Sequence, residues 1–366
     1  MKLCFLANAN SIHSFKWIKY FADKGYEIHW VSLTPNQVGE IKGVKFYRLK
    51  EFGPKSFDIL FNVIPARKLI KKINPDILHA HYAGVNGVLG ALSGFHPYIL
   101  TAWGSDILIA PKSRVVRSLI RFALSKADLI TCDAEHMKKA MVKLGVDPSK
   151  IEIIHFGIDI KKFAPGPEDQ DVVRRLGTKD APVVISLRSL DPLHDIETLV
   201  RAVPLVLKKV PKAIFVIAGK GHEEENLKNL ADNLGVSQSI RFIGWVSQDE
   251  IPYYLRAADV FVSTALSDAG VFGGSIAEAM ACGLPVVVTN IGENENWIQD
   301  GGAGYLFPIK SPDILAKRIT DLLKNQQIRK KFGERGRAIV EEEGNYYREM
   351  KKMQRLYDEV IMEKEY

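Results

Sequence analysis

The segment STALSDAGVFGGSIAEAMACGLPVVVTN, residues 263–290, decides the fold of the second half of the chain. A glycine-containing loop leads into a short helix, Cys282-Gly283 close that helix, and a buried strand follows. Glycine lets backbone N–H groups approach an anion closely, and a helix N-terminus favours negative charge. Glu278, one turn into the helix, can accept hydrogen bonds from vicinal hydroxyls. The segment therefore predicts a phosphate and a ribose held side by side.

Strands and helices alternate along the rest of the chain. Strands are predicted at residues 2–7, 27–33, 44–48, 76–80, 98–101, 183–187, 213–218, 240–243, 260–263 and 285–289. The predicted helices include residues 15–24, 63–73, 84–92, 197–209, 223–234, 248–257 and an amphipathic helix at 349–363. Such alternation predicts parallel sheets whose ligands bind at the carboxyl ends of the strands. Residues 161–180 resemble a linker, so we expect two doubly wound α/β domains with a cleft between them.

Composition sets the class of protein. The chain has 366 residues, of which 46% are hydrophobic and 25% charged, which is ordinary for a soluble globular protein of two domains. Cys4, Cys132 and Cys282 lie far apart, which indicates buried small residues in a reducing compartment. The opening MKLCFLANANS is interpreted as a first strand and not as a signal peptide. No apolar run is long enough to span a membrane.

The positive charge is concentrated in the first half of the chain. Residues 1–160 carry 22 Lys and Arg against 13 Asp and Glu, whereas residues 161–366 carry 28 against 30. Such an excess suggests an anionic lipid, a nucleic acid or an anionic substrate, and the alternative is a solvated lysine-rich surface. Within residues 111–126, Arg114, Arg117 and Arg121 share one helical face. Two interpretations stay open for this helix: an ordinary surface helix, or an interfacial helix docked on anionic lipid.

The residues EAMACGLPVVVTN closely resemble the nucleotide-sugar motif of the family-4 glycosyltransferases, of the "glycosyl transferases group 1" type. Five further segments match the same pattern, at residues 7–32, 76–92 followed by 98–108, 186–202, 215–235 and 240–265. The resemblance implies the GT-B fold, in which two Rossmann-like domains face each other across a cleft. Residues 1–165 would bind the acceptor and residues 166–345 the nucleotide sugar. Residues 346–366 would form a helix that crosses back to the first domain.

The resemblance also implies an activity. It is similar to that of retaining hexosyltransferases, which move a sugar from a nucleoside diphosphate sugar to a hydroxyl of a lipid-linked or polysaccharide acceptor. Such enzymes need no metal and no cofactor, because the nucleotide sugar is the substrate. Membrane-associated relatives imply a cytoplasmic protein bound peripherally to the inner face of the cell membrane.

A donor site follows from the matching positions. The resemblance implies that the donor is held by Arg188, His194, Gly219, Gly221, Gly244, Val246, Phe272, Gly273, Gly274 and Glu278. Arg188 would bind the diphosphate, since a guanidinium matches phosphate geometry. His194 stands where family members usually carry a second, lysine cation. The first of the family's two glutamates falls at Gly270, and Asp268 could replace it if the loop bends.

The acceptor or sugar side draws on the first half of the chain. It comprises His13, Trp103, Asp106 and, from the second half, Asp268. Catalytic roles are assigned to Arg188, Glu278 and His81. Trp103 stands where relatives often carry histidine, and its ring can stack on a sugar. Asp106 could hold hydroxyls or cap a helix, and Trp17 is expected in the core.

Other functions stay open at this stage. A non-catalytic nucleotide-sugar-binding protein on a membrane is one alternative, because two family positions are altered. A GT-B nucleotide-sugar 2-epimerase is another. No nucleic-acid recognition module is found, and no Gly-x-Gly-x-x-Gly follows the first strand, which argues against a nicotinamide dehydrogenase.

Overall fold

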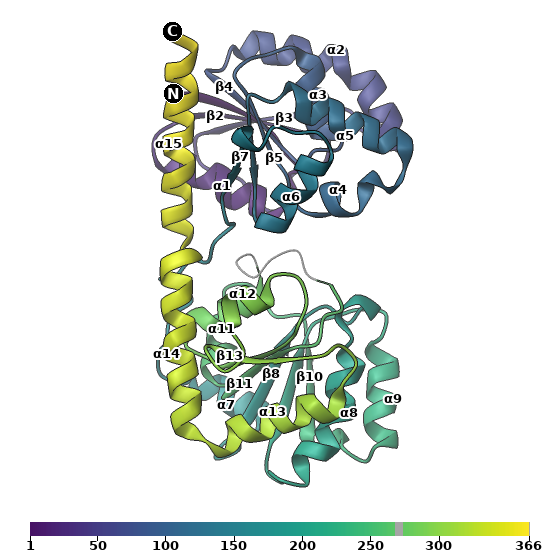
Figure 1. Ribbon diagram of the computed structural model, residues 1–366, viewed down its shortest axis with the longest axis vertical. Helices are drawn as coiled ribbons and strands as arrows, with labels where there is room; N and C mark the ends of the chain where they lie inside the picture. Colours follow the sequence, from purple (N-terminus) through teal and green to yellow (C-terminus); the bar gives the residue numbers. More distant parts are fainter. Residues whose placement is uncertain (268–273, 366) are drawn as a thin grey trace. The chain divides into compact units, whose positions relative to one another are not determined.

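The computed structural model describes residues 1–267 and 274–365, and the chain divides into two compact units. Unit 1 comprises Met1–Phe156 and Tyr347–Tyr366, and unit 2 comprises Gly157–Tyr346. This division falls earlier than residue 165, where the sequence places the boundary. Each unit is built on one parallel sheet with helices packed on its faces (Figure 1), which confirms the α/β class.

Unit 1 contains a seven-stranded sheet in the order β3-β2-β1-β4-β5-β6-β7, with every pair parallel. Its strands are β1 Lys2–Leu6, β2 Glu27–Ser32, β3 Val44–Arg48, β4 Ile77–His81, β5 Tyr98–Thr101, β6 Leu129–Cys132 and β7 Ile151–Ile153. Its helices are α1 Ile12–Asp23, α2 Lys55–Ile73, α3 Val85–Ser93, α4 Ser105–Leu108, α5 Arg114–Lys126, α6 Glu135–Lys143 and α15 Tyr346–Glu365. The strand order reverses between β1 and β4, which is where doubly wound sheets bind ligands.

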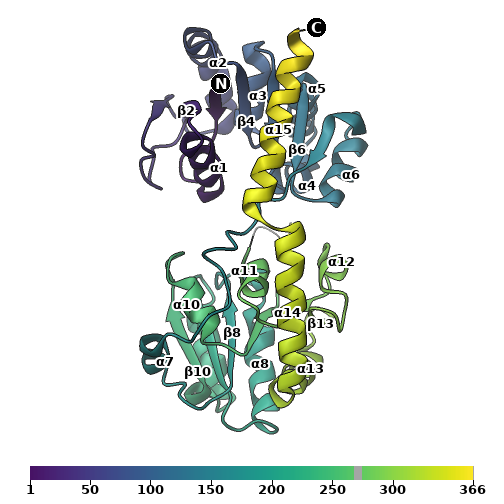
Figure 2. The same ribbon diagram turned by 90° about the vertical axis from the view of Figure 1, so that its left-hand side faces the viewer.

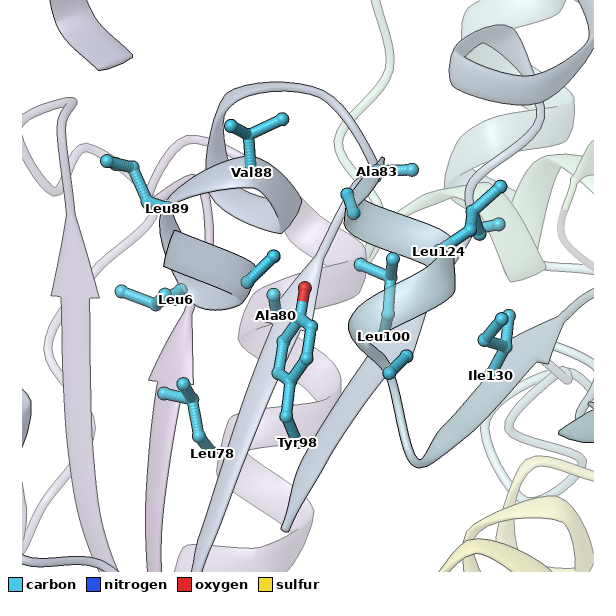
Figure 3. Packing of buried hydrophobic residues seen from close by; sticks show 14 of the residues in the cluster. Leu6, Leu78, Ala80, Ala83, Val88, Leu89, Tyr98, Leu100, Leu124 and Ile130 are labelled. Carbon is cyan, nitrogen blue, oxygen red and sulfur yellow. The ribbon is translucent and has the colours of Figure 1, made fainter. Parts of the chain in front are cut away.

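The core of unit 1 lies between the sheet and the layer formed by α2, α3 and α5. Figure 3 shows Tyr98 standing up from β5 among Leu78, Leu100 and the helices. The Tyr98 hydroxyl donates a 2.8 Å hydrogen bond to the carbonyl of Gly87 in α3. A Cβ at Gly90 would come within 2.6 Å of the Tyr98 ring. Glycine at position 90 is therefore explained by this ring, against which the helix packs directly.

The last helix, α15, packs on unit 1 (Figure 2). Met353 and Tyr357 of α15 are fully buried. The Tyr357 hydroxyl lies 2.6 Å from Nδ1 of His79, and His79 Nε2 lies 2.6 Å from the Thr101 hydroxyl. His79 is thus a core histidine with both ring nitrogens hydrogen-bonded.

Unit 2 contains a six-stranded parallel sheet in the order β10-β9-β8-β11-β12-β13. Its strands are β8 Val183–Leu187, β9 Ile214–Ala218, β10 Ile240–Gly244, β11 Val260–Ser263, β12 Val286–Thr289 and β13 Gly304–Phe307. Its helices are α7 Gln170–Leu176, α8 Ile196–Leu207, α9 Glu224–Asn233, α10 Ile251–Arg256, α11 Ser275–Ala281, α12 Asn294–Ile298, α13 Pro312–Lys324 and α14 Gln326–Glu343. Again the order reverses once, between β8 and β11.

Both faces of the second sheet are apolar because its strands alternate between two cores. Val183 and Ile185 of β8 pack into the cluster that contains α11 and α14. Val184 between them packs into the cluster that contains α8 and α13. A strand buried on both faces appears in the sequence as a continuous apolar run, as VVI at residues 183–185 does here.

Two predictions about local structure are wrong. Residues 161–180 are not only a linker, because they contain α7, whose Val172, Val173 and Leu176 are buried. The Asp169 carboxylate accepts hydrogen bonds from the N–H groups of residues 171 and 172, so Asp169 caps the start of α7. The helix predicted at 63–73 begins earlier, at Lys55.

Candidate functional site

The strand reversal of unit 2 brings two loops together. After β8 the chain forms a short turn at Pro192–His194, and after β11 it continues through Thr264 and Leu266. The Thr264 hydroxyl donates a 2.7 Å hydrogen bond to the carbonyl of His194, and the N–H of Leu266 donates to the carbonyl of Leu193. His194, whose side chain is half-buried, is thereby fixed at the point where an open α/β sheet binds its ligand.

Gly219 and Gly221 allow the loops after β8 and β9 to pack backbone against backbone. A Cβ at Gly219 would lie 1.9 Å from the carbonyl oxygen of Arg188, and one at Gly221 would lie 2.2 Å from that of Leu190. The N–H of Leu190 donates to the carbonyl of Lys220 across this contact. The two glycines are thus required by loop packing, and they set the backbone positions of Arg188 and Lys220.

A cavity of about 330 Å³ opens at the carboxyl ends of β8, β9 and β10. Its lining includes Arg188, Lys220, Trp245 and Val246. Trp245 is 69% exposed, so its ring is not part of the core. The cavity joins two cations, an aromatic face and a backbone turn, and this combination suits a phosphorylated aromatic ligand.

Sequence reasoning gave Lys220 and Trp245 too little weight. Lys220 is exposed and lines the same cavity as Arg188. The sequence did contain a sign of this position, because Lys220 stands between Gly219 and Gly221, which pack closely against another loop. The cation that the family pattern places at His194 therefore has a second candidate in Lys220.

Glu278 lies in the first turn of α11, where it is 8% exposed. The side-chain amide of Gln248 donates a 2.6 Å hydrogen bond to Glu278 Oε1. Gln248 follows the loop of Gly244, Trp245 and Val246, so this bond ties the carboxylate to the wall of the cavity. Gln248 is a further residue that the sequence did not indicate.

Part of the predicted site cannot be placed. Asp268, Gly270, Phe272 and Gly273 lie outside the described residues. Gly274 is the residue preceding α11, and a side chain there would meet open space. Gly244 has a φ of +69°, and its carbonyl accepts a 2.7 Å hydrogen bond from the N–H of Gly219.

Unit 1 has a cluster of rings at the carboxyl ends of its strands, formed by His13, His81, Trp103 and Phe156. His13 stacks on Phe156 with ring centroids 4.8 Å apart, and its ring lies 5.4 Å from that of Trp103. His81 follows at 5.5 Å from Trp103. His13, Trp103 and Phe156 are half-buried, whereas His81 is 1% exposed. The structure therefore brings three of the predicted residues together, and Phe156 is an addition.

Both histidines of this ring cluster are neutral near pH 7. Burial, and then the charge of His13, lowers the pKa of His81 to about 3. Burial, and then Lys16, lowers the pKa of His13 to about 4. Nδ1 of His81 lies 3.1 Å from the hydroxyl of Ser14. An imidazole so weakly basic is better suited to orienting neighbours than to removing a proton, because a general base works best with a pKa near the operating pH.

Asp106 is fully buried, and its carboxylate accepts hydrogen bonds from two loops. The N–H of Ala83 donates to Oδ2 at 2.7 Å, and the N–H of Trp103 donates to Oδ1 at 3.0 Å. Burial raises the pKa of this carboxyl, and the backbone N–H groups oppose the rise. Asp106 thus holds together the loops after β4 and β5, next to the ring cluster.

The histidines make unit 1 sensitive to acid. Below pH 6.5 the unfolded chain binds a proton on His81, whereas the folded chain stays neutral down to about pH 3. The free energy of unfolding should therefore fall on acidification, by about 2 kcal/mol from this residue between pH 7 and pH 5. We expect His81→Leu to lose that part of the pH dependence in urea titrations. His222→Gln, at an exposed histidine, should retain it, and equal pH dependence in His81→Leu and wild type would contradict the assignment.

Helix α5 uses most of its apolar arc for the core. Ile120 and Ala123 are buried and Leu119 packs beside them, whereas Val115 is 70% exposed. Arg114, Arg117 and Arg121 are exposed. This helix presents a basic face but only a small apolar one.

Two family models match the chain. "Glycosyl transferases group 1" matches residues 169–339, and "Glycosyl transferase 4-like" matches residues 2–134. The two matches fall in units 2 and 1, respectively. The chain belongs to the group 1 glycosyltransferases of the GT-B class, as the sequence motifs predicted.

Curated relatives of the chain are named for different activities. The chain is 24% identical over 359 residues to N-acetyl-alpha-D-glucosaminyl L-malate synthase of Bacillus anthracis. This match covers 94% of this chain and 92% of that enzyme. It is 29% identical to the GDP-mannose-dependent alpha-(1-6)-phosphatidylinositol monomannoside mannosyltransferase of Mycolicibacterium smegmatis. That match covers 61% of this chain and 60% of the mycobacterial enzyme.

Solved structures show the same fold. A glycosyltransferase from Rickettsia africae matches with a TM-score of 0.83 at 19% identity, covering 98% of each chain. An Anabaena protein solved in complex with UDP also gives 0.83 at 19% identity, covering 98% of this chain and 100% of its own. The GT-B expectation is confirmed at the level of the fold.

Within the described part of the chain, no group of three or more His, Cys, Asp or Glu could hold a metal ion. The three cysteines are buried and unpaired with one another. Over the same residues no helix is long and apolar enough to cross a bilayer.

Proposed function

We propose that this glycosyltransferase is a retaining hexosyltransferase that takes its sugar from a nucleoside diphosphate sugar. The observation that supports this most strongly is the cavity of unit 2, where Arg188 and Lys220 lie beside Trp245 and Val246. In this proposal the cations bind the diphosphate and Trp245 contacts the base. Glu278, tied to the cavity wall through Gln248, accepts hydrogen bonds from the ribose hydroxyls.

The reaction needs charge stabilisation more than acid–base catalysis. An acceptor hydroxyl attacks the anomeric carbon from the face that the diphosphate leaves, the bond from that carbon to the diphosphate oxygen breaks, and the hydroxyl proton passes to the departing phosphate. The negative charge that develops on the diphosphate is stabilised by Arg188 and Lys220. Because side-chain cations fill this role, we propose that the reaction needs neither a metal ion nor a cofactor.

The proposed acceptor is a lipid-linked saccharide or a growing polysaccharide. The Mycolicibacterium relative acts on a phosphatidylinositol monomannoside, as its name states. Rings at the carboxyl ends of the unit 1 strands, Trp103 and His13 foremost, offer a surface for a sugar. We further propose that the protein works in the cytoplasm, peripherally bound to an anionic membrane through unit 1. The excess of positive charge in residues 1–160 supports that location.

A donor panel tests the proposal. The protein is incubated with UDP- and GDP-sugars and a membrane lipid extract, and both the nucleoside diphosphate and the glycosylated product are measured. We expect release of the diphosphate in step with the product, with the anomeric configuration of the donor retained, and activity that survives a chelator. Inversion of configuration or loss of activity in the chelator would contradict the mechanism.

A non-catalytic nucleotide-sugar-binding protein is the second candidate. It is favoured by the replacement of the usual lysine by His194 and by Gly270 at the position of the first glutamate. Tight nucleotide binding without turnover of any donor would support it.

A further inference from the structure

Helix α2 carries an apolar stripe on its outer side. Phe57, Leu60, Phe61 and Ile64 are spaced at i, i+3, i+4 and i+7, so they share one face. Leu60 and Ile64 are each 66% exposed, Phe61 is 51% exposed and Phe57 is 48% exposed. Phe52, just before the helix, extends the stripe, with its ring centroid 4.9 Å from that of Phe61. A contiguous apolar patch of this kind marks an interaction surface, which scattered single residues do not.

The stripe is separate from the face of α2 that packs on the core of unit 1. The opposite side of α2 already packs on unit 1, through Asn62, Ala66, Ile70 and Ile73, all buried. Asn62 is fixed there by hydrogen bonds from its side-chain amide to the carbonyls of Lys50 and Asp58. One side of α2 is therefore committed to packing on unit 1, and the apolar stripe lies apart from it.

The charge of α2 has one sign. Its exposed charged residues are all cationic: Lys55, Arg67, Lys68, Lys71 and Lys72. Its one acid, Asp58, is buried and accepts a 2.7 Å hydrogen bond from the N–H of Phe52. The outer face thus changes along its length from apolar, at residues 57–64, to basic, at residues 67–72.

We infer that α2 is the element that inserts into an anionic bilayer, with Phe57, Leu60, Phe61 and Ile64 below the headgroups and the basic turns at the headgroup level. An amphipathic helix with large apolar residues beside Lys and Arg lies in the membrane interface in this manner. The inference deepens the proposed membrane association and rests on it, but it does not depend on the transfer chemistry.

Charge complementarity favours lipid over a second copy of the chain. In a two-fold symmetric dimer the same patch meets itself, so the cations of one α2 would find no acidic partner on the other, because the one acid of the helix, Asp58, is buried. An anionic surface instead attracts each cation within a Debye length. Helix α5 supplies further positive charge in the same helical layer, since α3 packs against both α2 and α5. Its apolar arc, however, is committed to the core, so α5 is not the inserting helix.

The test measures sedimentation of the full chain with vesicles, in the absence of donor. Vesicles of phosphatidylcholine alone are compared with vesicles of equal parts phosphatidylcholine and phosphatidylglycerol. One variant combines Phe57→Gln, Leu60→Gln and Ile64→Gln, and another combines Lys68→Gln, Lys71→Gln and Lys72→Gln. The matched control combines Val142→Gln and Leu205→Gln, two exposed apolar residues on helices outside the patch.

We expect wild type and control to bind the anionic vesicles alike, and the apolar variant to bind them at least about tenfold more weakly. The lysine variant should lose most of the preference for phosphatidylglycerol. Unchanged binding of the apolar variant would overturn the inference, as would a wild-type dimer that the same substitutions dissociate. Nucleotide affinity, measured without vesicles, should be equal in all four proteins, so a failure here is distinguishable from a failure of the donor site.

Discussion

Replacing Arg188 with alanine should lower kcat by about 100- to 1000-fold, the loss that follows removal of one charge-stabilising donor from an active site. Arg188 follows β8 directly and lines the cavity of unit 2. Its contribution should be larger in the transition state than in the bound donor, because negative charge grows on the diphosphate as the sugar leaves. We therefore expect kcat to fall more than the affinity for the donor, as measured by steady-state kinetics and calorimetry.

Arg188→Lys distinguishes charge from geometry. Lysine keeps the charge but loses the rigid fork of donors, so part of the activity should return. Lys220→Ala should also lower kcat, and Lys212→Ala, at an exposed lysine that does not line the cavity, should not. Full activity in Arg188→Ala would remove Arg188 from the mechanism.

Replacing Glu278 with alanine should weaken binding of nucleoside diphosphates by about 100-fold. Two ribose hydroxyls would lose a charged acceptor, and a hydrogen bond to a charged group contributes about 1.5–3 kcal/mol. Isothermal titration with UDP and GDP measures the effect. A thermal melt of the variant should be measured as well. Glu278 is nearly buried, and its replacement also removes the hydrogen bond that Gln248 donates to it, so the fold of the variant must be checked.

Two variants serve as comparisons for Glu278. Gln248→Ala leaves the carboxylate in place but removes a bond that positions it, so we expect a smaller loss of affinity. Glu295→Ala changes an exposed acid in the first turn of α12 and should bind nucleotide like wild type. If Glu278→Ala folds and binds with wild-type affinity, the ribose role is wrong.

Several strands were predictable from the sequence alone. The predicted bounds of β3, β5, β8 and β11 agree with the structure residue for residue. β6, β7 and β13, by contrast, were missed, and the three residues of β7, IEI, are too short to show a period. Helix α7 was missed because Pro165 and Pro167 before it, together with the charges around it, suggested a linker, although Asp169 and Gly177 were sufficient as caps.

Helix α2 shows a different limit. Its outer stripe places apolar residues where an amphipathic helix carries polar ones, so the expected period vanished over residues 55–62 and the prediction began at Val63. Local rules tend to fail at surfaces with a function, because such residues are not placed for the stability of the fold.

Site residues that belong to a sequence motif were predicted. Site residues whose position depends on how separate loops pack together were predicted only in part. Arg188 and Val246 were indicated by their segments and do line one cavity. Lys220 and Trp245 were quoted but undervalued, because their exposure follows from how two loops pack. The link from Gln248 to Glu278 joins residues 30 positions apart, and no local pattern could reveal it.

A crystal structure with a nucleoside diphosphate bound tests the central claim most directly. The diphosphate should contact Arg188 and Lys220, the base should lie against Trp245 and Val246, and the ribose hydroxyls should reach Glu278. A nucleotide bound in unit 1, or bound in unit 2 away from the ends of β8, β9 and β10, would contradict the assignment of the donor site.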